Sequence, residues 1–158
     1  MRASSPVQAS LPSARAAGTL RAFLLVIAAL VYLGVVIELW FTDHTMELLQ
    51  ILPFVVCLAA FAVVASALLR PRRPTLRLVR ATLPLVVAVS LLGIYEHVHA
   101  NYEFEREIRP NASTLSVFEK SLHGVAPILA PGSLGLAGVL AVAATWQHPL
   151  LTGPDEES

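Results

Sequence analysis

Residues 48–69 read LLQILPFVVCLAAFAVVASALL, without a single Asp, Glu, Lys or Arg. A helix needs about 20 mostly apolar residues to cross the hydrocarbon core of a bilayer. A spanning strand needs only about 10 residues and alternates apolar with polar side chains, and this stretch does not alternate. We therefore predict that residues 48–69 form a membrane-spanning helix.

Three other stretches on either side have the same character. Residues 20–41 carry only Arg21 and Glu38 as charged residues, and residues 125–146 carry none. Pro127 and Pro131 predict that the last of these helices begins irregularly. The predicted fold class is all-α, an integral membrane four-helix bundle, with spans at about 20–41, 48–69, 76–100 and 125–146.

The composition supports a membrane protein. Of 158 residues, 56% are hydrophobic and 14% charged, and the mean hydropathy is +0.68. A soluble chain carries about 25% charged residues. The 11 basic residues are balanced by 11 acidic ones, which argues against nucleic-acid binding. The single cysteine, Cys57, excludes an internal disulfide and a cysteine-rich metal site.

Basic residues set the predicted orientation, because they concentrate in cytoplasmic loops. Eight arginines precede the first span or lie between the second and third, whereas only Arg106, Arg109 and Lys120 lie between the third and fourth. Both termini are therefore predicted to be cytoplasmic. Ten arginines to one lysine are typical of a GC-rich bacterium, so the predicted location is the bacterial inner (cell) membrane, with the lipid bilayer as partner.

The chain divides into three predicted regions. Residues 1–19, rich in Ser, Ala and Pro, form a flexible cytoplasmic tail; residues 20–149 form the transmembrane domain; residues 150–158 form an acidic cytoplasmic tail. The outer segment, 102–124, is the largest piece outside the membrane.

Within the outer segment, one apolar stripe predicts a short amphipathic helix. Asn111 or Ser113 could cap it, and Leu115, Phe118 and Leu122 fall on one face. We expect this face to lie on the membrane surface or to pack over the helix ends.

Ionisable residues gather on the predicted outer side, which holds eight of the eleven acids and four of the five histidines. Such residues at membrane depth cost about 3 kcal/mol or more, so they are candidates for function. The group consists of Glu38, Asp43, Glu47, Glu96, Glu103, Glu105, Glu107 and Glu119, with His44, His97, His99 and His123.

Helical phase, at about 100° per residue, sorts these candidates. Ser90, Gly93, His97, Asn101 and Phe104 share one face. Small residues mark faces where membrane helices approach closely. His97 and Asn101 are therefore predicted to point into the bundle. The candidate metal-ligand set is Glu38, His44, His97, Asn101 and Glu105, and a second set on another face is Glu96, His99 and Glu103.

Three interpretations of these residues stay open. Imidazole and carboxylate ligands suit Zn, Fe, Cu or Mn, and Glu96 with His99 has the Glu-x-x-His spacing of di-iron bundles. His97 and Glu38 could instead relay protons. In the structural interpretation, His97, Asn101 and Glu38 hydrogen-bond across helices and stabilise the bundle.

Three runs of sequence carry a resemblance. They are GIYEHVHANYEFE at 93–105, the segment 38–53 with His44 and Gln50, and Leu129 to Gly132 read with His148-Pro149. Over about residues 38–149 the chain resembles small four-span bacterial membrane proteins of unassigned function. The resemblance implies that the residues most relevant to function are Glu38, His44, His97, Asn101 and Glu105. It implies no activity.

The sequence contains no nucleophile–base pair, Gly-rich phosphate loop or Cys-x-x-Cys motif. We therefore expect no enzyme and no resident cofactor. The predicted function is a multi-pass integral membrane protein that serves as an accessory subunit or oligomeric partner, either a homo-oligomer or joined to another membrane subunit. The alternative is a metal- or proton-handling protein that uses the outer His/Glu cluster, with a divalent metal as its cofactor.

Overall fold

The computed structural model describes residues 11–42 and 48–152, and those residues form helices and connecting turns without a strand. The all-α prediction is therefore confirmed for this part of the chain. Two of the predicted candidates, His44 and Glu47, lie outside the described residues. The helices are α1 (Leu11–Phe41), α2 (Leu48–Leu69), α3 (Arg73–Ile108), α4 (Thr114–Ser121), α5 (Leu129–Ala144) and α6 (Pro149–Thr152).

Three helices, α1, α2 and α3, are long and apolar enough to cross a membrane. The helix at the fourth predicted span, α5, is shorter than predicted: it contains 16 residues, Leu129–Ala144, within the predicted range 125–146. At 1.5 Å per residue it is about 24 Å long, less than the roughly 30 Å of a hydrocarbon core. As the two prolines indicated, residues 125–128 are not helical and α5 begins only at Leu129.

The helix ends also differ from the predicted regions. Helix α1 begins at Leu11, so residues 11–19 are helical instead of belonging to a flexible tail. Alanine, leucine and arginine in this stretch favour a helix. Helix α3 continues to Ile108, beyond the predicted span at 76–100. Helix α6 takes in residues 150–152 of the predicted acidic tail.

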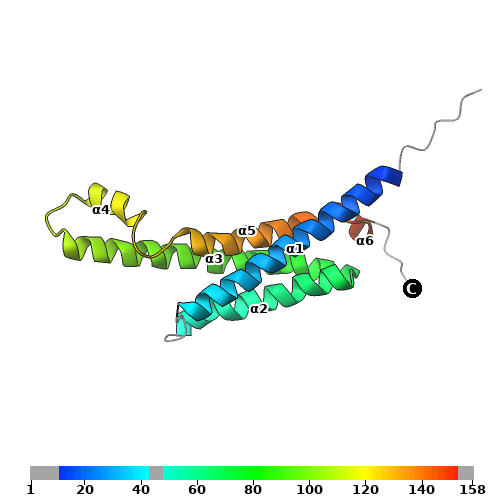
Figure 1. The fold of residues 1–158 in the computed structure, drawn as a ribbon, viewed down its shortest axis with the longest axis horizontal. Coiled ribbons are helices and arrows are strands. Elements are labelled where there is room, and N and C mark those ends of the chain that lie inside the picture. The colour runs from blue at the N-terminus through cyan, green and yellow to red at the C-terminus, as the bar shows by residue number, and fades with distance from the viewer. Residues whose placement is uncertain (1–10, 43–47, 153–158) are drawn as a thin grey trace, which may run out of the picture.

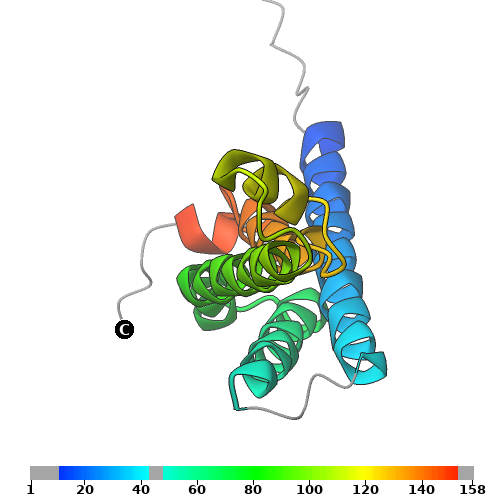
Figure 2. The ribbon, with the colours of Figure 1, turned by 90° about the vertical axis from the view of Figure 1, so that its left-hand side faces the viewer.

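Helices α1, α2, α3 and α5 form a bundle in which each contacts two neighbours (Figure 1, Figure 2). α5 packs between α3 and α1, and α2 completes the ring on the other side. Small residues on α5 make this close packing possible. Ala137 and Thr145 are fully buried, and a side chain at Gly138 would come within 3.0 Å of Val86.

The outer end of α3 extends beyond the bundle, with α4 alongside it (Figure 1). We call α4 and residues 101–108 of α3 the outer projection. Ser113 caps α4 as predicted, by accepting a hydrogen bond from the Ser116 amide at 3.3 Å. Val117 is buried, whereas Leu115 and Phe118 are exposed. The expectation that the apolar stripe packs over the helix ends is therefore wrong, because α4 packs through its opposite face.

Candidate functional site

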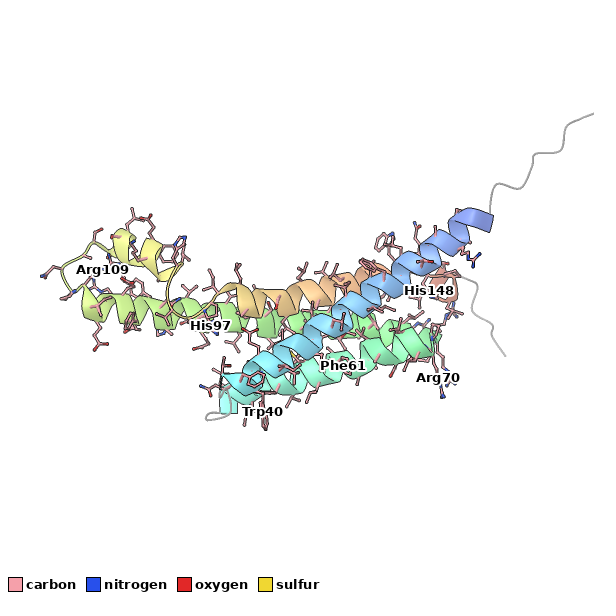
Figure 3. The ribbon with its side chains drawn as sticks, in the orientation of Figure 1. Trp40, Phe61, Arg70, His97, Arg109 and His148 are labelled. Carbon is pink, nitrogen blue, oxygen red and sulfur yellow. The ribbon has the colours of Figure 1, made fainter. Side chains whose placement is uncertain are left out.

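A cavity of about 430 Å³ opens at the outer end of the bundle. It exists because the outer end of α1 and the start of α2 diverge from α3, as the positions of Trp40 and His97 in Figure 3 illustrate. α1, α2, α3 and the segment before α5 all contribute to its walls. We call this space the outer cavity.

The lining of the outer cavity changes along the helices. Toward the middle of the helices it is apolar, and this part, which we call the floor, includes Val35, Leu52, Val89 and Leu134. Its mouth, nearer the outer helix ends, carries the polar side chains. These are Glu38, Thr42, Gln50, Glu96 and His97. Among the described residues, no lysine or arginine lines the cavity.

His97 joins α3 to the segment that precedes α5. Its Nδ1 lies 2.9 Å from the carbonyl oxygen of Pro127. Because a carbonyl oxygen only accepts, Nδ1 carries the proton and donates. The imidazole thus holds one wall of the outer cavity in place.

Asn101 lies one turn further out and is buried, with 3% of its surface exposed. Its Nδ2 donates to the carbonyls of Ser121 and Ala126, at 3.0 and 2.9 Å, and its Oδ1 accepts from the Ala126 amide at 2.9 Å. A side chain at Gly124 would clash with this amide, so only glycine fits there. The Asn101 side chain therefore bonds three backbone groups of residues 121–126.

Ser90 completes the same face of α3 further into the bundle. Its hydroxyl donates to the Pro131 carbonyl at 2.7 Å. Gly93 lets the two segments touch, since a Cβ there would lie 2.7 Å from the Pro131 Cβ. The face that helical phase predicted therefore holds residues 121–131 by hydrogen bonds to their backbone. We call Ser90, Gly93, His97 and Asn101 the polar face of α3.

The structure separates the first candidate set. Glu38 and His97 line the outer cavity, and Asn101 bonds the backbone beside it. Glu105 instead pairs with Arg109 one turn further along α3, with 2.9 Å between Arg109 Nε and Glu105 Oε2. His44 lies outside the described residues.

The second candidate set is separated too. Glu96 lines the outer cavity beside His97, because the cavity is wide enough to reach two faces of α3. His99 is exposed and its ring lies 5.8 Å from that of Tyr95. Within residues 11–42 and 48–152, no three His, Cys, Asp or Glu side chains are grouped as metal ligands.

Sequence reasoning missed the contacts at the C-terminal end of α5. Arg80 donates to Thr145, from Nε to Oγ1 at 2.9 Å and from Nη2 to the carbonyl at 2.8 Å. Arg21 donates to the Gln147 carbonyl at 3.0 Å, and Arg73 to the Leu150 carbonyl at 2.9 Å. The arginines were visible in the sequence, but nothing in it identified these carbonyls as their partners.

His148 lies between α5 and α6, as labelled in Figure 3. Partial burial lowers the pKa of its imidazole below the usual 6.5, and the positive charge of Arg21 lowers it further. Its Nδ1 lies 3.2 Å from the Leu150 amide, which donates to it.

Comparisons of the chain with protein-family models, with curated proteins and with solved structures give no match. The resemblance to small four-span bacterial membrane proteins therefore stays a prediction. Functional inference rests on the outer cavity, the outer projection and the sequence pattern.

Proposed function

We propose that this chain is a four-span, multi-pass integral membrane protein of the bacterial inner membrane, with both termini cytoplasmic. In it α5 is the fourth span. Non-helical backbone is tolerated at membrane depth only where protein surrounds and hydrogen-bonds it. The bonds from His97 and Asn101 to the segment before α5, and from Arg80 to the residue after it, meet that condition.

We further propose a non-catalytic role, as one subunit of a membrane assembly. The observation that carries this proposal is the apolar surface of the outer projection. Leu115 is 76% exposed and Ile108 55%, with Phe104 and Phe118 nearly half exposed. If α3 enters the hydrocarbon after Arg80, about 20 residues bring it to the far side near Ala100.

Lipid tails would therefore not reach these side chains. Large apolar side chains gathered on one surface and exposed to water mark an interaction site. The projection must then be covered by protein, and we take the occupant to be a second copy of this chain.

Charge supports self-association. The exposed residues of the outer projection include both acidic and basic side chains, on α3 and on α4. A two-fold interface brings each patch against its own copy, so the acids of one chain can face the bases of the other. These residues are Glu103, Glu107 and Glu119, with Arg106 and Lys120.

Cross-linking in native membranes tests this assembly. A single cysteine replaces Leu115 in a Cys57→Ala background, and a matched control carries its cysteine at Pro74, at the start of α3 and the opposite end of the bundle. A short bifunctional thiol reagent should double the apparent mass of the Leu115→Cys protein only. A product of another mass would identify a different protein as the partner, and no product would contradict the assembly.

The alternative function, metal or proton handling, is supported by one feature: Glu38 and His97 share the outer cavity. A metal would need a further donor, and His44 is the candidate that the sequence offers. Elemental analysis of the purified protein tests it. A stoichiometric metal that is lost in His97→Ala would favour this alternative over a purely structural His97.

A further inference from the structure

The outer cavity carries negative charge that no described group neutralises. Glu38 and Glu96 line it, and neither carboxylate makes a hydrogen bond or ion pair with the described residues. As noted above, no described lysine or arginine lines the cavity.

The cavity also has a direction. Its carboxylates belong to the mouth, and Val35, Val89 and Leu134 belong to the floor. Val35 precedes Glu38 by about one turn of α1, and Val89 precedes Glu96 by about two turns of α3. A molecule lying along this direction would meet charge at one end and hydrocarbon at the other.

We propose that the outer cavity binds a free organic cation with an apolar body, an amphipathic amine or quaternary cation. Its charged group lies between Glu38 and Glu96, and its apolar part covers the floor. This inference goes beyond the proposed assembly role, since the outer projection is not part of the cavity. It also concerns a different region from the dimer contact, so the two proposals can fail separately.

Size and chemistry favour such a ligand over a bare metal ion. At about 430 Å³ the cavity falls within the usual range of small-molecule sites, roughly 300–1,000 Å³. An apolar floor supplies no oxygen ligand to a hydrated metal ion. Contact between this floor and a hydrocarbon group is favourable, because both apolar surfaces are removed from water.

Equilibrium binding of radiolabelled tetraphenylphosphonium tests the proposal, with the full chain in nanodiscs of an uncharged diglucosyl lipid, which carries no amine, at pH 7.5. This probe keeps its charge at every pH. Tetraphenylborate has nearly the same shape and the opposite charge, so it serves as the ligand control. We expect saturable binding of the cation and no competition by the borate.

Variants locate the site. Glu38→Gln and Glu96→Gln should each weaken binding several-fold, and the double variant about tenfold or more. Glu103→Gln removes an exposed carboxylate of α3 that does not line the cavity, and it should bind like the parent. Leu92→Trp fills part of the cavity without changing charge, and it should also weaken binding. Thermal unfolding of each variant identifies any that do not fold.

Four results would overturn the proposal. They are no saturable binding by the parent chain, equal binding of the borate, full affinity in the folded double Gln variant, and loss of binding in Glu103→Gln. Repeating the titration with phosphatidylethanolamine in the discs distinguishes a lipid amine from a free cation. Strong competition by that lipid would identify the occupant as lipid and contradict a free ligand.

Discussion

The two ends of α5 are held by different chemistry. At its outer end, side chains on the polar face of α3 bond the backbone before the helix, and the outer cavity lies beside them. At its other end, Arg80 and Arg73 from α3 and Arg21 from α1 donate to carbonyls after the helix. One helix supplies the first set of bonds, and two helices supply the second.

The difference follows from what each end of a helix leaves unsatisfied. The last carbonyls have no partner within the helix and carry partial negative charge, which suits cationic donors. An irregular segment leaves both N–H and C=O groups unsatisfied, which suits an amide that donates and accepts. Arginine also belongs on the cytoplasmic side. The bonds before α5 therefore involve no arginine, and the carboxylates of the outer cavity stay available to bind a ligand.

Asn101→Ala should have the largest effect on this comparison. It removes three hydrogen bonds to Ser121 and Ala126 at a buried position. Leaving those backbone groups unsatisfied should lower the free energy of unfolding by about 2–4 kcal/mol. Thermal unfolding in detergent measures the loss. Glu103→Ala, on the exposed side of the same helix, is the control; an equal loss there would contradict the anchoring role of Asn101.

His97→Ala should cost less, since it removes the bond to the Pro127 carbonyl. We expect a loss of about 1–2 kcal/mol, and a much smaller one for the exposed His99→Ala. Repeating both unfolding measurements with a chelator separates a structural bond from a bound metal. Should the two variants lose the same stability, the polar face would be wrongly assigned at His97.

Arg80→Met tests the opposite end of α5. It removes both bonds to Thr145, but these bonds are only partly buried, so we expect a loss of only about 1 kcal/mol. Arg70→Met is the control. It removes the same positive charge, but the Arg70 side chain makes no hydrogen bond to the described residues, so the loss of stability should be smaller. If Arg70→Met proves as costly, net charge and not the contact with Thr145 would explain the effect.

The sequence predicted which side chains hold the two ends of α5 only in part, and it did not predict the backbone groups that they bind. Charge-free runs predicted the long helices, and helical phase predicted that His97 and Asn101 face inward. The carbonyls they bind lie in a segment made irregular by Pro127, where no periodicity fixes the backbone. Glu96 was placed with the wrong neighbours because the width of the outer cavity depends on how far α1 diverges from α3, which no local pattern encodes.

His148 should give the smallest effect, a pH dependence confined to the arginine end. Its pKa in the folded chain lies below the usual 6.5, so the unfolded chain binds more protons as the pH falls. Stability should therefore decline as the pH drops below about 6.5, and His148→Gln should decline less. Unfolding temperatures at pH 7.5 and 5.5 compare the two proteins, and identical declines would show that His148 does not contribute.

Accessibility of single cysteines tests the four-span topology, on which both ends of α5 depend. Cysteines replace Pro74, Ala112 or Thr152 in a Cys57→Ala background, and a membrane-impermeant thiol reagent is applied to intact cells. We expect labelling at position 112 alone, with 74 and 152 labelled only after lysis. Labelling of both 112 and 152 in intact cells would show that α5 does not cross the membrane and would contradict the four-span bundle.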